Sequence, residues 1–325
     1  MQQIRSFFLF LKFHFLKILF TFGATLFFLL ALFPFSDLSD VISVQISKAT
    51  QGQIFVQFET LGISLFPDTG LNLTNLSVET PAFGPLNVDE LTFFPSIPGL
   101  IFQTPSGRMK LRGILKGDLD VALTPGKKTD LGNSTLNVRL QGQSIVLNDL
   151  GRIANLPISF NGQLDLTLSG FAEPTFAEQP EVEVELKIDR LEIPPSTLES
   201  QMGPISLPDL RISKLELKGR LTGGRFNIEK GTLGAAQDDI SGTIKGGVSL
   251  TFQNRGGGLN IIPGSYNIES DLIMSTSFEA RAKSPLSFVF LLLDNYKSTA
   301  ANGTRYAFKA TGSGPQSPPS LSALR

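Results

Sequence analysis

Acidic side chains are the residues of this sequence whose spacing could support chemistry. Asp118 and Asp120 share one face of a predicted strand, as a general acid and a general base would. Alternate positions of residues 181–189 carry carboxylates, which are the ligands that calcium prefers. Asp238 and Asp239 stand next to a predicted turn. Because no EF-hand loop is present and lysines lie among these carboxylates, we interpret all three groups as charges of a solvated face.

Bases and nucleophiles are scarce. The chain has no cysteine, which excludes disulfides and thiolate metal sites, and its one histidine, His14, lies in an apolar segment. The remainder therefore has no imidazole for general base catalysis, a hydrolase triad or zinc binding. Serine is abundant, but no G-x-S-x-G motif is present. The run Gly256–Gly258 lacks the strand-then-helix context of a phosphate loop. We expect no enzymatic activity, no cofactor and no bound metal.

Length and charge leave a large β protein as the simplest class. The 325 residues are enough for one large domain or two smaller ones. The formal net charge is −1, which gives no electrostatic reason to expect nucleic acid as a partner.

The N-terminal segment predicts a membrane anchor. Residues 7–35 are dominated by Phe and Leu, and 18–35 carry no charge, which is near the length of a transmembrane helix. Lys12 and Lys17 precede this run and Asp37 follows it, so the positive-inside rule places the N-terminus in the cytoplasm. A cleaved signal peptide is the alternative, but no small-x-small cleavage site follows the run. The predicted anchor residues are Phe13, Phe15, Leu19, Phe22, Leu26, Phe28, Leu30 and Phe33.

The domain boundaries follow from this anchor. Residues 1–36 form the cytoplasmic stub and anchor, 37–312 a β domain beyond the membrane, and 313–325 a flexible tail rich in Pro and Ser.

Strict alternation of apolar and charged residues predicts the fold. The pattern is clearest in residues 109–124, MKLRGILKGDLDVALT, which we interpret as one strand of about 50 Å. It recurs in residues 135–146, 158–170, 181–190 and 240–252. Glycines on the apolar parity are typical of a sheet that bends. The predicted fold class is mainly β: a transmembrane helix followed by a long, curved, largely antiparallel sheet, an open groove or half-barrel, with a few short amphipathic helices.

The apolar parity of these strands is the predicted inner surface of the curled sheet. The predicted groove residues are Met109, Leu111, Leu115, Leu119, Val121, Leu123, Leu136, Val138, Leu140, Leu164, Leu166, Leu168, Val182, Val184, Leu186, Ile244, Val248 and Leu250. Changes of parity at residues 73–76 and 212–215 predict two β-bulges. We expect a loop with a helical turn at 196–201.

Two short helices are predicted. Residues 147–156 have helical spacing, with Asn148 as the cap. Ser284 and Pro285 begin an apolar segment in which serine caps the helix and proline takes its first position. This segment could cover the apolar face or enter a membrane interface, and we favour the first. The predicted lid residues are Phe288, Phe290, Leu291 and Leu292.

The layout resembles the type II secretion system protein N (general secretion pathway protein N) family. The resemblance is carried by the anchor, by the glycine-spaced alternation in LRGILKGDLDVAL and FNGQLDLTLSG, by LNDLGRIANLPISFNGQLDL, and by SPLSFVFLLLDNY before TRYAFKATGSGPQSPPSL. It covers nearly the full length. The same pattern resembles the wider AsmA-like group of inner-membrane proteins with long β grooves.

The resemblance implies a single-pass protein of the bacterial inner membrane with its bulk in the periplasm. It implies an accessory structural component of the type II secretion system, with the secretin or the inner-membrane platform subunits as partners and no catalytic residues. The alternative is a lipid-handling groove protein, in which the apolar parity contacts the acyl chains of phospholipid. Both functions stay open at this point.

Overall fold

The computed structural model describes most of the chain as antiparallel strands. The described residues are 14–17, 19–25, 28, 38–50, 52–64, 69–80, 83–96, 99, 106–128, 134–154, 156–174, 176–200, 203–255, 258–314 and 317–324. Among them, 16 strands form one sheet, and β10 (Ser196–Ser200) and β11 (Gly203–Leu207) form a separate hairpin.

The sheet is a meander in which chain neighbours pair. Its strands are β1 (Phe55–Gln57), β2 (Thr60–Ser64), β3 (Gly70–Thr80), β4 (Phe83–Pro95), β5 (Gly107–Ile114), β6 (Gly117–Lys128), β7 (Ser134–Val146), β8 (Asn161–Ala172), β9 (Glu181–Ile193), β12 (Leu210–Thr222), β13 (Arg225–Leu233), β14 (Ile240–Arg255), β15 (Gly258–Ser275), β16 (Lys297–Ala300), β17 (Gly303–Gly312) and β18 (Ser320–Ala323). From β3 to β15 the strands follow sequence order, except that β9 pairs β12 across the β10–β11 hairpin.

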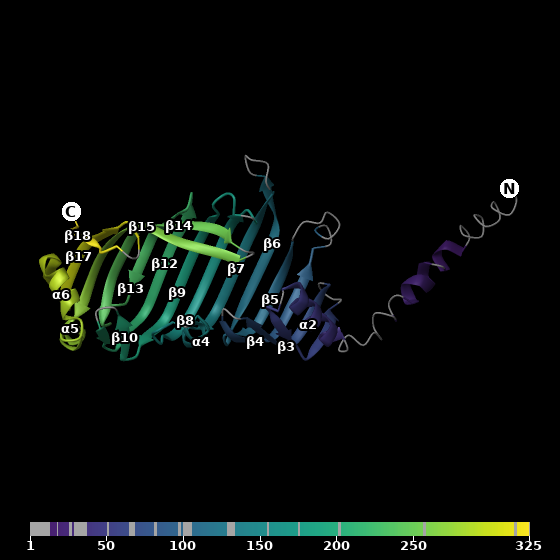
Figure 1. Cartoon of the computed structure of the whole chain (residues 1–325), viewed down its shortest axis with the longest axis horizontal. Coiled ribbons are helices and arrows are strands. Elements are labelled where there is room, and N and C mark those ends of the chain that lie inside the picture. Colours follow the sequence, from purple (N-terminus) through teal and green to yellow (C-terminus); the bar gives the residue numbers. More distant parts are fainter. Residues whose placement is uncertain are drawn as a thin grey trace.

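Short helices lie at the ends and along one edge of this sheet (Figure 1). They are α2 (Leu38–Ala49), α4 (Leu147–Ile153), α5 (Thr276–Ala282), α6 (Ser287–Leu293) and the 3-10 turn η2 (Asp294–Tyr296). Figure 1 shows α2 at the end of the sheet nearest the N-terminus, and α5 and α6 at the opposite end. The mainly β, antiparallel class predicted from the alternation is confirmed.

The predicted anchor is only partly described. Phe13, Leu26, Leu30 and Phe33 lie outside the described residues, whereas Phe15, Leu19, Phe22 and Phe28 are helical and exposed. Within the described part of the chain, no helix has the length and hydropathy needed to cross a membrane.

The pattern at residues 109–124 is a hairpin, and the prediction of one long strand is wrong. Leu115 and Lys116 take φ values of 50° and 60°, so the chain reverses between β5 and β6. Positive φ at both central residues is the signature of a type I′ turn. Ile114 pairs with Gly117, which reverses the parity, and a register shift at Gly113 restores it, so Met109 faces Val121 across the pair. The sequence hides this turn because neither central residue is Gly, Asn or Asp.

Parity changes occur at a series of residues with positive φ. Asn75 (φ 49°) separates Leu73 from Leu76, and both leucines belong to the same apolar cluster, so the predicted change of parity is present. The register of β3 with β4 is the same before and after Asn75, so the expected extra residue of a bulge is not seen in this pair. The second predicted slip lies opposite Arg190 (φ 54°), between the pairs Ile212–Leu191 and Lys214–Asp189.

Equivalent irregularities occur in β5 and β7. Gly113 (φ 72°) and Ser144 (φ 54°) coincide with register shifts in these strands. The amide of Ser144 donates to Asp165 Oδ1 on β8 at 2.8 Å, so the group that leaves the ladder is still hydrogen-bonded.

Other local predictions differ from the structure. The helical turn predicted at 196–201 is the β10–β11 hairpin. The helix at 147–153 is confirmed, but its cap is Val146 and Asn148 instead donates to Asn161. Ser284 caps no helix, because α6 begins at Ser287. Within the predicted tail, Ser320–Ala323 form β18 against β17.

Buried hydrophobic side chains lie at both ends of the sheet, and five more lie on β7, β8, β9 and β12 between them: Ile145, Leu164, Leu191, Ile212 and Leu221. At the first end, Phe58, Leu76, Val88, Leu111 and Ile114 form a buried cluster, against which Ile42 of α2 packs. The sequence analysis missed this helix.

At the second end, α5 and α6 pack on β17. Tyr306 is 2% exposed and stacks edge-on with Phe290 at 6.2 Å between ring centroids. Burial, together with the nearby Glu279 carboxylate, raises the pKa of Tyr306 to about 12, so its hydroxyl stays protonated. That hydroxyl donates to Glu279 Oε1 at 3.3 Å.

Between these ends the sheet is a single layer except where the outer part of the β14–β15 hairpin crosses it (Figure 1). Most residues of the apolar parity in β6–β9 are half-buried, as expected for a sheet with solvent access on both faces.

Candidate functional site

The sheet has one apolar face and one charged face. The apolar face is defined by a row of directly paired residues that crosses twelve strands without a polar side chain. The row runs Leu71, Phe93, Met109, Val121, Leu140, Leu168, Val184, Gly219, Ile228, Gly246, Ile268 and Ala310. At about 4.8 Å between strands the row is about 50 Å long.

A second, parallel row widens this face. It contains Leu123, Val138, Gly170, Val182, Leu221, Phe226, Val248 and Tyr266. Most predicted groove residues therefore share one face. Two do not lie on the central face: Leu115 is in the β5–β6 turn, and Leu250 lies beyond the register shift in β14.

The apolar face is only partly shielded from solvent. Of the predicted groove residues, Leu111 and Leu164 are buried, at 8% and 7% exposed, and the others are half-buried. Leu71 and Phe93 at the start of the row are 39% and 38% exposed. Burying apolar surface contributes roughly 25 cal/mol per Å², so a continuous open face of this kind favours an apolar occupant.

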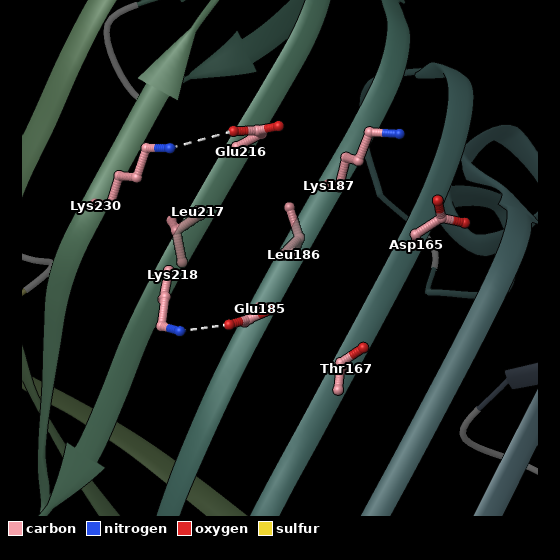
Figure 2. Close-up of a pocket in the computed structure, with 9 residues that line it drawn as sticks. All are labelled: Asp165, Thr167, Glu185, Leu186, Lys187, Glu216, Leu217, Lys218 and Lys230. Carbon is pink, nitrogen blue, oxygen red and sulfur yellow. Dashed lines mark hydrogen bonds and ion pairs between the residues drawn. The ribbon is translucent and has the colours of Figure 1, made fainter.

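The opposite face carries ion pairs between neighbouring strands (Figure 2). Lys218 contacts Glu185 at 2.5 Å and Lys230 contacts Glu216 at 3.6 Å. These residues line a pocket of about 360 Å³ in the middle of the charged face. Glu183 and Glu185 thus pair with Arg220 and Lys218 of the neighbouring strand, and Asp189 pairs with Lys187 of its own strand. These exposed pairs agree with the interpretation as a solvated face.

Two ionisable groups of this pocket, Glu216 and Lys218, are held in their charged forms. The hydrogen bond from Lys214 lowers the pKa of Glu216, and the hydrogen bond to Glu185 raises the pKa of Lys218. Both shifts move the pKa of the group further from neutral pH, whereas a general acid or base works best with a pKa near the operating pH. Asp120 behaves in the same way, because Arg108 lowers its pKa. Among the described residues, no group of three or more potential ligands could hold a metal ion.

The outer part of the β14–β15 hairpin leaves the plane of the sheet. A register shift between Val248 and Leu250 marks the bend, and the segment 250–263 beyond it, here called the hairpin extension, crosses β12 and β9 (Figure 1). None of its residues lines the pockets of the charged face, and Figure 2 draws the charged side chains with the extension behind the strands. The extension therefore lies on the apolar side.

Gln179 holds this extension at the edge of the sheet. Its side-chain amide donates to the carbonyl of Phe252 at 3.2 Å and accepts from the amide of Phe252 at 2.9 Å. Phe176 stacks on Phe252 with 6.4 Å between ring centroids.

Helix α6, which contains the predicted lid residues, covers only the end of the apolar face. Phe290 packs on Tyr306, and Leu293 is buried. Leu291 and Leu292 point to solvent, at 77% and 55% exposed, and Phe288 is 42% exposed. The helix thus leaves the middle of the apolar face open.

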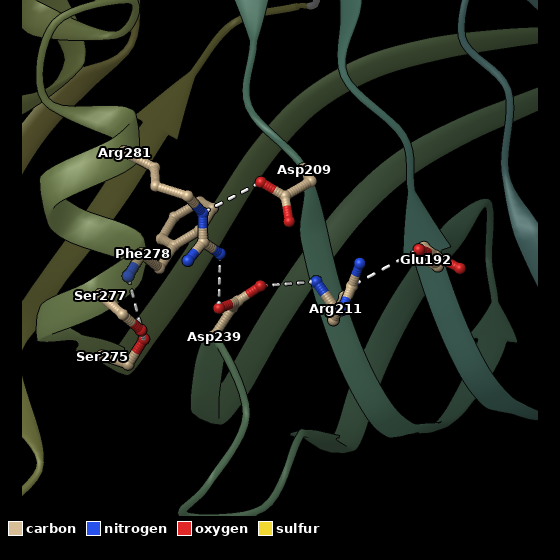
Figure 3. Close-up of polar contacts among 8 residues, drawn as sticks. All are labelled: Glu192, Asp209, Arg211, Asp239, Ser275, Ser277, Phe278 and Arg281. Carbon is tan, nitrogen blue, oxygen red and sulfur yellow. Dashed lines mark hydrogen bonds and ion pairs between the residues drawn. The ribbon is translucent and has the colours of Figure 1, made fainter.

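An ionic network fixes α5 to the sheet (Figure 3). Arg281 contacts Asp209 at 3.0 Å and Asp239 at 2.8 Å, and Asp239 also accepts from the amide of Arg211 at 2.8 Å. The hydrogen bond to Asp239 raises the pKa of Arg281.

Asp238 and Asp239 are consequently structural, and their interpretation as ordinary solvated charges is wrong. Asp238 accepts hydrogen bonds from Ser213 and from the amide of Ala235. The sequence offered one signal for this junction, the serine-rich start of α5, where Ser275 caps the helix by accepting from the amide of Phe278.

Comparison with known proteins adds no family: no family model, curated protein or solved structure matches the chain.

Proposed function

We propose that this protein binds the acyl chains of phospholipid along its apolar face and acts without catalysis. The observation that carries this proposal is the apolar row across twelve strands, half-buried and open between two capped ends. Hydrocarbon chains need apolar surface without hydrogen-bond partners, and the row offers neither a donor nor an acceptor from its side chains.

The ends of the sheet support the same function. Ile42 of α2 packs at one end and Phe290 of α6 at the other, so the helices limit the apolar face without covering its centre. The hairpin extension crosses the centre on the same side. The open part of the apolar face is therefore a trough, which α2 and α6 bound at its two ends and the hairpin extension crosses once.

The place of action is part of the proposal. The apolar segment before Asp37 and its flanking lysines favour an anchor in a bacterial inner membrane with the sheet in the periplasm. An anchored trough would stand beside the lipid that it binds.

A second candidate is an accessory component of the type II secretion system. It is supported by the resemblance over nearly the full length and by the charged face, whose exposed ion pairs could make polar contacts with secretin or platform subunits. One scaffold could serve both functions, because the two use opposite faces.

Purification of the full chain in mild detergent separates these candidates. Mass spectrometry of the purified protein is expected to find phospholipid at a fixed ratio. Val184→Asp and Leu168→Asp place a charge in the middle of the row and should each reduce bound lipid at least severalfold. Thr167→Asp is the matched control, because it lies on the same strand and faces the other side.

Loss of lipid counts only for variants that retain the circular dichroism spectrum of the parent protein. Equal lipid content in all four proteins would contradict lipid binding. Co-purification of secretion subunits that survives Val184→Asp would support the second candidate.

A further inference from the structure

Helix α6 has apolar side chains on both of its faces. Phe290 and Leu293 pack on the sheet, whereas Phe288, Leu291 and Leu292 form a stripe at spacings of three and four on the opposite side. A helix that is hydrophobic all round is normally buried. Here the stripe remains 42%, 77% and 55% exposed, so a partner is needed to cover it.

The chemistry of the stripe fits a lipid surface better than a protein. Within Ser287–Leu293 only Ser287 has a polar side chain, so the helix offers a protein almost no directional contacts. The three exposed side chains supply on the order of 300 Å². A stable dimer buries about 800 Å² on each partner, which is well beyond this stripe.

Position and a flanking cation agree with this assignment. Lys283 precedes the helix and is exposed, as are the cations beside the apolar face of interfacial helices. Lys297 follows the helix, is exposed and pairs with Asp294. Three nearby cations pair with acidic residues on or next to the sheet: Arg281, Arg305 and Lys309. Figure 1 shows α6 at the end of the sheet opposite α2.

We infer that α6 is a membrane-docking tip, whose Phe288, Leu291 and Leu292 enter the interface of an anionic phospholipid bilayer. Its inner side belongs to the apolar face through Phe290 and Tyr306, so docking places the end of that face against lipid. The inference goes beyond acyl-chain binding, because the stripe would dock whether or not the trough holds lipid.

A position-specific dye on the full chain tests this inference. The chain has no cysteine, so Asn295→Cys gives one labelling site on the exposed side of the tip without altering the stripe. Thr167→Cys labels the charged face as a control. Each protein is reconstituted in vesicles of phosphatidylcholine and phosphatidylglycerol with a lipid-attached quencher, either in the same vesicles or in a second population.

The dye at position 295 is expected to be quenched at least twofold more than the dye at 167. The double variant Leu291→Ser, Leu292→Ser should remove this difference, because its tip is expected to bind the bilayer roughly tenfold more weakly. Because both leucines are exposed, the double variant should keep the thermal unfolding of the parent protein.

Two outcomes would overturn the inference. One is equal quenching at both sites in vesicles with and without phosphatidylglycerol. The other is a change in the fluorescence of the dye at 295 that depends on protein concentration and not on lipid. That result would show that the stripe binds a second copy of the chain. A failure of lipid co-purification alone would leave this result unchanged.

Discussion

At the scale of single residues, close backbone approach decides which glycines are required. Gly246 takes a φ of 127°, and an added Cβ would lie 2.0 Å from the carbonyl oxygen of Asn267 on β15. Gly242 is similar, with a φ of 144° and an approach of 2.1 Å to the carbonyl of Asp271. Both lie on the apolar parity of β14, so these glycines permit close pairing where a side chain would force the strands apart.

Gly246→Ala should destabilise the protein by about 1–3 kcal/mol, because it combines strained φ with a backbone clash. Urea unfolding followed by circular dichroism measures this change. Gly84→Ala is the control, since an added Cβ there meets nothing within 4 Å. Equal stability of the two variants would contradict the close approach at Gly246.

Asp238 should make stability depend on pH. Burial alone would raise its pKa, but hydrogen bonds from Ser213 and Ala235 outweigh burial and lower it. A carboxyl whose folded pKa is depressed stabilises the fold above its unfolded pKa, at roughly pH 4, and this contribution is lost as the pH falls through the folded value. Asp238→Asn should therefore cost about 1–2 kcal/mol at pH 7, and less near pH 3.

Unfolding midpoints of the parent and of Asp238→Asn, measured from pH 7 to pH 3, check this sign. A difference that grows on acidification would contradict it.

At the scale of elements, alternation in the sequence predicts which residues share a face but not where the chain turns. The apolar face was readable from period two, and most predicted groove residues lie on it. The β5–β6 hairpin was not readable, because the register shift at Gly113 restores the parity that a two-residue turn reverses, and because Leu115 and Lys116 are unusual turn residues. Helices α2 and α5 were missed because they are short and packed at the ends, where tertiary contacts outweigh local propensity.

Arg281→Gln should release α5 from the sheet. It removes contacts of 3.0 and 2.8 Å and leaves Asp239, whose side chain is 12% exposed, without a cation. Amide hydrogen exchange should accelerate in residues 276–296 and stay unchanged in β3–β5. Lys283→Gln is the matched control on an exposed neighbour. Unaltered exchange in Arg281→Gln would show that the apolar contacts of α6 suffice.

Gln179→Ala should free the hairpin extension. The change removes both hydrogen bonds to Phe252 and leaves two backbone groups without these partners. We expect faster amide exchange in residues 250–263 with at most about 2 kcal/mol lost in overall stability. Glu178→Ala, one residue earlier, serves as the control. If the amides of the hairpin extension stay protected from exchange in Gln179→Ala, the contact with Phe176 is what holds the extension in place.

At the scale of the whole molecule, the apolar face of β7–β12 leaves room for a ligand, because the described helices pack at the ends and along one edge of the sheet (Figure 1). Amide hydrogen exchange compared with and without lipid measures the effect of a ligand at this face. Added phospholipid should protect β7–β12 most, because a ligand stabilises the residues that bind it. Uniform protection by lipid across the sheet would contradict binding at the centre.

Pairing between chain neighbours has a consequence for how this sheet is made. Every strand from β4 to β9 finds its first partner among residues already synthesised, and each closure spans only a short loop. A polypeptide delivered N-terminus first, from a ribosome or a translocation pore, can therefore zip up one hairpin at a time. For the same reason, insertion or deletion of one hairpin within the sequence would lengthen or shorten the sheet and leave the helices at both of its ends unchanged.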